Sequence, residues 1–265
     1  MLELILIVAL VPTLAITLWE NMVGRLAPRA WLVYRTTAIV GTPVHEMAHV
    51  LACMMFGMRV NEVALYRPHA PSGQLGFVSF SFNPRSWFQV IGLAVQGVAP
   101  LLVSGTIAVL ALELIRSPGR PDQGMLPLLA WCVELASMTL ESLVALATSG
   151  LNGALIAAGL LLVCMHGIPS WQDVKVGLRG LLFIAVVISI LGLLNEAYWF
   201  LGSPFGGTFD EWASFLSGEF ERGLWWALHG AVLTVTLAAL ASTLLLVIPA
   251  VIFSVVNAAR RPIGA

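Results

Sequence analysis

The chain has 265 residues, of which 59% are hydrophobic and only 10% are charged. Because soluble domains carry about 25% charged residues, this composition excludes an ordinary soluble protein and predicts an integral membrane protein in contact with the lipid bilayer. The net charge of −1 gives no sign of nucleic-acid binding. The three cysteines lie in apolar runs without C-x-x-C spacing, which predicts buried thiols instead of a disulfide framework.

Seven apolar stretches are candidates for membrane-spanning helices, which need about 20 residues each. We therefore predict an all-α polytopic membrane protein with six or seven transmembrane helices. If all seven stretches cross, Lys and Arg gather on one side, and the positive-inside rule puts the C-terminus in the cytoplasm. The first stretch lacks a basic leader region and a cleavage site, so we expect a retained span. The stretches are Leu2–Trp19, Thr36–Met58, Trp87–Ile115, Leu126–Ala147, Leu151–Met165, Leu181–Phe200 and Leu224–Val256.

The second stretch contains an H-E-x-x-H motif, His45-Glu46-Met47-Ala48-His49. On a helix this spacing places the two imidazoles one turn apart on one face, where both can bind the same zinc ion, with Glu46 beside them as a general base. A charged side chain at the centre of a bilayer costs roughly 2.5–3.5 kcal/mol, so such groups are rarely there without a partner. The motif therefore predicts a metal site in an apolar helix.

Two short segments after the motif helix are expected to form a β-hairpin close to the membrane. Val60–Tyr66 and Leu75–Phe82 are separated by a loop with two prolines and a glycine, and the second segment alternates apolar residues with serines. An apolar strand edge there can hold an extended peptide by strand addition at Leu75–Phe82. The alternative is a surface hairpin that only packs on the bilayer.

A catalytic zinc usually has three protein ligands, so the two histidines need a third partner. The segment from His166 to Asp173 follows an apolar run and is expected to break the helix at Pro169. We predict Asp173 as the third ligand, with His166 as its competitor. The alternative is that Asp173 only begins a new helix, where the helix dipole favours a carboxylate in the first turn.

These motifs together resemble the site-2 protease group of intramembrane zinc metalloproteases, over residues from about 36 to 180. The Gln96–Pro100 segment is similar to a Gly-Pro-containing core helix of that group. The chain differs from the group in four respects: no Leu-Asp-Gly surrounds the aspartate, a histidine replaces an asparagine, the spacing from that histidine to the aspartate is shorter by about one residue, and no PDZ-like insert is visible. The segments that carry the resemblance are His45–His49 followed by Gly57, Gln96-Gly-Val-Ala-Pro100, and His166-Gly-Ile-Pro169 followed by Asp173.

The resemblance implies an intramembrane zinc metalloprotease that hydrolyses peptide bonds in or near transmembrane segments of membrane-protein substrates. It implies that His45, His49 and Asp173 bind Zn²⁺. Glu46 would then act as the catalytic base, and His166 could donate to the oxyanion. Because the three ligands must lie at one depth, this geometry favours six spans, whereas the charge distribution favours seven.

We expect a single transmembrane domain over residues 1–265, with a protease-like core at about 36–180 and flanking helices at 1–20 and 181–257. The expected location is a bacterial cytoplasmic membrane, as a multi-pass protein. Two other functions are open: a non-catalytic scaffold or accessory subunit that retains the protease fold, and a zinc carrier. A carrier usually distributes polar residues over several spans, whereas here polarity concentrates in one motif. The retained His, Glu and His favour an enzyme.

Overall fold

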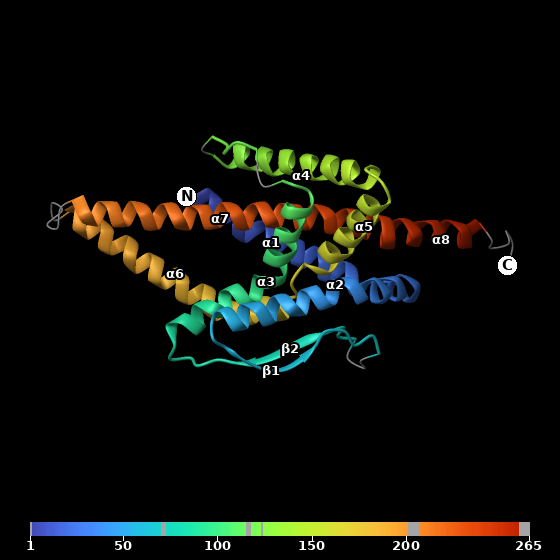
Figure 1. Ribbon diagram of the computed structural model, residues 1–265, viewed down its shortest axis with the longest axis horizontal. Coiled ribbons are helices and arrows are strands. Elements are labelled where there is room, and N and C mark those ends of the chain that lie inside the picture. Colours follow the sequence, from blue (N-terminus) through green and yellow to red (C-terminus); the bar gives the residue numbers. More distant parts are fainter. Residues whose placement is uncertain (1, 70–72, 115–117, 123, 201–206, 260–265) are drawn as a thin grey trace.

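The computed structural model describes residues 2–69, 73–114, 118–122, 124–200 and 207–259 of the protein. Helices dominate this part of the chain, and a small two-stranded sheet accompanies them (Figure 1). In chain order the elements are α1 (Leu2–Val23), α2 (Pro28–Met55), β1 (Arg59–Ala64), β2 (Phe77–Ser81), α3 (Trp87–Ala111), α4 (Met125–Thr148), α5 (Leu151–His166), α6 (Trp171–Phe200), α7 (Gly207–Ser242), the π-helix η1 (Thr243–Val247) and α8 (Ile248–Ala259).

Four of the described helices are long and apolar enough to cross a membrane, and there are five such spans if the bent pair α5 and α6 counts as one. The four are α2, α3, α4 and the stretch from Glu221 to Val256 along α7, η1 and α8. Large apolar side chains remain exposed on them, among them Leu126 at 79% on α4 and Val255 at 62% on α8. Such exposure suits contact with lipid. These helices fit a multi-pass membrane protein, and the count of six or seven spans stays a prediction.

The chain bends by 68° between α5 and α6. Helix α5 ends at His166, and Pro169 has no N–H with which to continue it. The predicted break at Pro169 is therefore confirmed. The apolar stretch Leu181–Phe200 is not a separate helix, however, because α6 runs unbroken from Trp171 to Phe200. Hydropathy identified only the apolar part of α6. Helical hydrogen bonding also includes the more polar residues 171–180 that precede this part.

The predicted hairpin is present, with shorter strands than expected, and β1 pairs with β2 in antiparallel orientation. It runs alongside α2 (Figure 1). At one end of the hairpin the hydroxyl of Tyr66 donates to the Arg35 carbonyl of α2 at 2.7 Å. At the other end Phe80 packs against a cluster that includes buried Cys53 and Leu93. The hairpin is thus held along the helix that carries the H-E-x-x-H motif.

Helix α6 approaches α3 closely because small residues face one another. A Cβ atom on Gly177 would lie 3.1 Å from the Gly97 Cα, and one on Gly180 would lie 2.4 Å from the backbone nitrogen of Ala94. Small residues at helix contacts let two backbones come together in a membrane. The contact also seats the first turn of α6, because a Cβ on Gly97 would lie 2.8 Å from the Asp173 carbonyl oxygen.

Replacing Gly180 with alanine is expected to force α6 away from α3 and to lower the free energy of unfolding by about 1–3 kcal/mol, the usual range for overpacking. The matched control is Gly159→Ala in α5, because a Cβ there meets nothing within 4 Å among the described residues. Alanine is the better helix former, so the control should be as stable as the wild type or slightly more stable. Thermal unfolding in detergent compares the two, and equal melting temperatures would contradict the close contact.

Candidate metal centre

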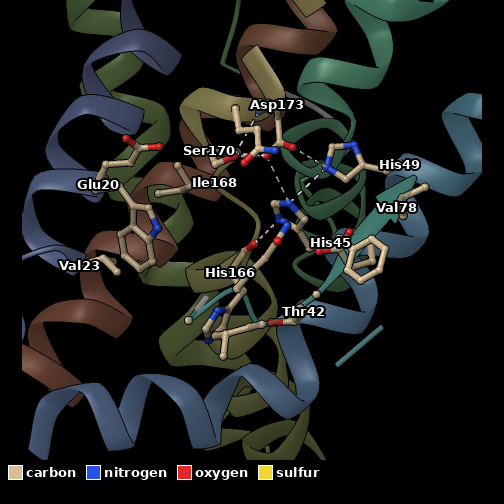
Figure 2. A pocket seen from close by; sticks show the side chains of 18 of the residues that line it. Glu20, Val23, Thr42, His45, His49, Val78, His166, Ile168, Ser170 and Asp173 are labelled. Carbon is tan, nitrogen blue, oxygen red and sulfur yellow. Dashed lines mark hydrogen bonds and ion pairs between the residues drawn. The ribbon is translucent and has the colours of Figure 1, made fainter. Parts of the chain in front are cut away.

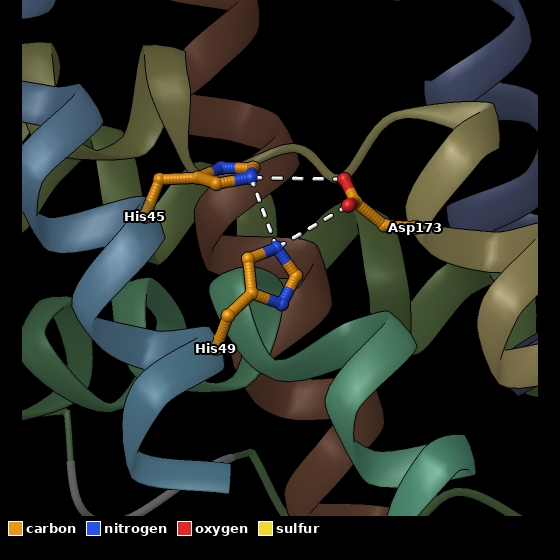
Figure 3. Close-up of side chains that lie close together, drawn as sticks. All are labelled: His45, His49 and Asp173. Carbon is orange, nitrogen blue, oxygen red and sulfur yellow. Dashed lines mark hydrogen bonds and ion pairs between the residues drawn. The ribbon is translucent and has the colours of Figure 1, made fainter. Parts of the chain in front are cut away.

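Three side chains from α2 and α6 converge on one point (Figure 3). The Nε2 atoms of His45 and His49 are 3.3 Å apart. The carboxylate of Asp173 places Oδ2 at 3.7 Å from His45 Nε2 and Oδ1 at 3.4 Å from His49 Nε2. Ligand atoms that are each about 2.0–2.2 Å from a tetrahedral zinc ion are roughly 3.3–3.6 Å from one another. The spacing of the three side chains therefore fits a metal ion.

Both histidine rings are oriented by hydrogen bonds on the side away from the cluster. Nδ1 of His45 lies 2.7 Å from the carbonyl oxygen of His166, and Nδ1 of His49 lies 2.9 Å from that of Gln96. A carbonyl oxygen can only accept, so each Nδ1 carries the ring proton and donates it. Each Nε2 then has a free lone pair directed at the cluster. Metal-binding histidines in proteins are typically held in this way by their second nitrogen.

The Asp173 carboxylate is oriented by the start of α6. Its Oδ2 accepts from the Ser170 backbone N–H at 2.8 Å and from the Ser170 hydroxyl at 2.7 Å, while the Asp173 N–H donates to that hydroxyl oxygen at 3.2 Å. This reciprocal pattern is a capping box, which satisfies donors that a helix leaves free at its N-terminus. Asp173 therefore lies in the first turn of a helix and also faces the two histidines. Its place at the helix start does not conflict with its predicted role as third ligand, which stays a prediction.

Glu46 is buried beside the cluster and lies beneath the chain that enters β2. A Cβ atom on Gly76 would lie 2.7 Å from Glu46 Oε1 and 2.8 Å from Thr42 Cγ2. The backbone at Gly76 can therefore pass over the glutamate only because the residue has no side chain. Glu46 itself is 6% exposed and lines the same cavity as the cluster.

The ring of His166 points away from the three ligand atoms. Its Nε2 lies 3.2 Å from the Thr37 hydroxyl, and its face lies against Tyr34 with the ring centroids 4.7 Å apart. A Cβ on Gly41 would lie 2.6 Å from the His166 Cβ, so this packing depends on the glycine. What His166 presents to the cluster is its main-chain carbonyl. Its role as a donor to an oxyanion stays a prediction.

One cavity of about 710 Å³ joins the predicted residues (Figure 2). His45, Glu46, His49, His166 and Asp173 all line it. Residues 73–80, which include most of β2, form one wall, and within the described chain no residue of β1 contributes. Helix α1 forms another wall, and the Glu20 carboxylate there accepts from the Trp171 N–H at 2.6 Å.

From the sequence we predicted no role for Ser170, Gly76 or Glu20, and for Gln96 only that its segment resembles a core helix of the protease group; all four hold or border the site. Ser170 had a local signal, since a serine three residues before an acidic residue is typical of a helix start. The other three act through tertiary contacts. No local pattern indicates such contacts.

Comparisons of the chain with models of known families, with curated proteins and with solved structures found no match. The resemblance to the site-2 protease group therefore rests on the motifs alone and stays a prediction.

The purified protein is expected to bind about one zinc ion per chain, and Asp173→Ala and His45→Ala are each expected to lose it, because two ligands rarely suffice. The control is Glu134→Ala, which removes an exposed carboxylate of α4. Metal analysis by mass spectrometry after gel filtration measures the content. Zinc retained by Asp173→Ala but lost by His45→Ala would assign the third ligand to another residue, and His166 would be tested next.

Proposed function

We propose that the chain is an intramembrane zinc metalloprotease of the site-2 protease type. The observation that carries this proposal is the convergence of His45, His49 and Asp173, with each imidazole Nε2 free to bind, beside the buried Glu46. Two histidines and a carboxylate form a usual ligand set of a zinc peptidase, and the glutamate next to the first histidine is its usual general base.

When bound here, zinc would lower the pKa of a water molecule to about 7 and polarise a substrate carbonyl. Glu46 would accept a proton from the water molecule while the water oxygen attacks the carbonyl carbon of the substrate. It would then pass that proton to the amide nitrogen as the C–N bond breaks. Glu46 and the three ligands line one cavity, so a single substrate segment there could meet all of them.

The substrate would be a transmembrane segment bound in extended form along β2. A peptide bond inside a helix is shielded by the hydrogen bonds of that helix, so cleavage requires local unwinding. Strand β2 has one edge with no neighbouring strand among the described residues, and residues 73–80 line the cavity. Strand addition would satisfy the backbone groups that the substrate exposes when it unwinds. The six-span topology belongs to this proposal, because it puts the hairpin and the Asp173 segment on one side.

The second candidate is a membrane scaffold or accessory subunit that keeps this fold without catalysis. The observation in its favour is the environment of Asp173, which is preceded by Gln172 and followed by Val174 where the protease group has Leu-Asp-Gly. Metal binding alone does not separate the two functions, because a scaffold can retain a structural metal. Cleavage that depends on Glu46 does separate them.

Glu46→Gln is expected to retain zinc and to abolish proteolysis, because glutamine is of the same size but cannot accept the proton. Wild-type and variant proteins are expressed in the same host, and new N-termini within transmembrane segments are mapped by mass spectrometry. Glu134→Gln on the exposed face of α4 is the control and should cleave as the wild type does. Identical N-termini from wild type and Glu46→Gln, with zinc present in both, would favour the scaffold.

Gly76→Ala is expected to retain zinc and to reduce cleavage at the mapped sites by a factor of about 10 or more. The added Cβ would overlap the Glu46 carboxylate, and shifts of about 1 Å in a catalytic group typically cost up to 10²-fold in rate. Gly159→Ala in α5 is the matched glycine-to-alanine control and should cleave as the wild type does, because a Cβ there meets nothing within 4 Å among the described residues. Full activity in Gly76→Ala would argue against this arrangement of β2 over Glu46.

A further inference from the structure

A proline lies inside α3 at a position that affects the metal centre. In an α-helix the N–H of residue i+4 donates to the carbonyl of residue i. Pro100 lies four residues after Gln96, within an otherwise continuous helix. Proline has no N–H, and its ring pushes against the carbonyl four residues earlier. The Gln96 carbonyl therefore lacks the i+4 backbone donor that it would otherwise have in its own helix.

That carbonyl is the one that accepts from His49 Nδ1, at 2.9 Å. Gln96 and His49 are each only 3% exposed, and Pro100 is fully buried. A buried carbonyl without a donor is costly, as is a buried imidazole N–H without an acceptor. Each of the two groups satisfies the other.

We infer that Pro100 is a positioning residue of the metal centre, which acts through the Gln96 main-chain carbonyl on His49. By withholding a backbone donor, the proline makes this carbonyl available to His49 and tilts it out of the α3 backbone. The carbonyl then fixes the proton of His49 on Nδ1 and directs Nε2 at the cluster. This inference rests on the metal site of the proposed function, and it does not require that the site be proteolytic.

The side chain of Gln96 provides a rival explanation that can be tested. Its amide also approaches His49 Nδ1, at 3.1 Å, and the Oε1 atom is buried with no hydrogen-bond partner among the described residues. Because Nδ1 donates its proton, the amide can assist only if its oxygen faces the ring. The Gln96 carbonyl oxygen lies closer to Nδ1 than the amide does, and it accepts the proton whichever way the amide is oriented. We therefore assign the main role to the backbone.

The two explanations predict different effects on metal affinity and on stability. Pro100→Ala restores a backbone N–H that competes for the Gln96 carbonyl, so His49 should lose its orientation while α3 gains a helical hydrogen bond. Gln96→Met removes the amide, keeps the main-chain carbonyl and preserves the volume of the side chain. The matched control is Pro12→Ala, which removes a proline inside α1 that does not line the cavity.

The experiment titrates metal-free protein with Co²⁺ and follows the visible absorption of the bound ion, and it measures thermal unfolding without metal. Loss of a group that orients a metal ligand typically weakens metal binding 10–100-fold. We expect Pro100→Ala to bind Co²⁺ at least about tenfold more weakly, with a melting temperature equal to or above that of the wild type. Pro12→Ala should bind as the wild type does, and Gln96→Met should bind more tightly than Pro100→Ala.

Wild-type affinity in Pro100→Ala would overturn the inference, and so would a loss confined to Gln96→Met, which would assign the role to the amide. Weaker binding together with a lower melting temperature would mean that the proline is merely structural. In any of these cases a wild type that binds Co²⁺ would leave the proposed function intact. Conversely, a protein that shows the expected pattern but cleaves no membrane protein would contradict the protease alone. A wild type that binds no Co²⁺ would overturn both.

Discussion

The bend between α5 and α6 is the feature on which the candidate metal centre depends. A continuous helix through residues 151–200 would use the His166 carbonyl and the Ser170 N–H in its own ladder. The bend instead gives the carbonyl to His45 and the N–H to Asp173. This one interruption therefore provides Asp173 as a candidate ligand and the Ser170 N–H that orients it. It also provides the His166 carbonyl that orients His45.

Close backbone approach is the second requirement of this site. The candidate metal-binding atoms of His45, His49 and Asp173 can meet beside Glu46 only if three pairs of segments lie in contact. These are α6 with α3, α5 with α2, and the chain before β2 with Glu46. Glycines stand at all three contacts, namely Gly177, Gly41 and Gly76, and at each a Cβ would come within about 3 Å of a neighbouring residue. In an apolar solvent the helices gain little from burying hydrocarbon, so contacts of this kind, with hydrogen bonds between helices, hold the domain together.

The sequence predicted those parts of the site that depend on local spacing. The i, i+4 relation of His45 and His49 is a property of one helix, and Pro169 interrupts helical hydrogen bonding whatever its surroundings. The sequence could not predict that Gln96 and Glu20 would meet these elements, because their partners lie far along the chain. It also placed the start of α6 too late, since the continuous apolar stretch begins at Leu181 whereas helical hydrogen bonding begins at Trp171. The hairpin was found from alternation, but its ends depend on packing against α2.

The contact between Glu20 and Trp171 has a consequence for the order in which the protein is assembled. It joins residues 151 positions apart, and the contact of His45 with the His166 carbonyl joins residues 121 positions apart. Contacts of such separation form late, because a long loop must be closed before they give any stabilisation. The two histidines are therefore synthesised well before the residues that orient them and the aspartate that completes the cluster. A metal ion that requires all three ligands can be retained only after α6 has docked, so its capture would mark the completion of the domain.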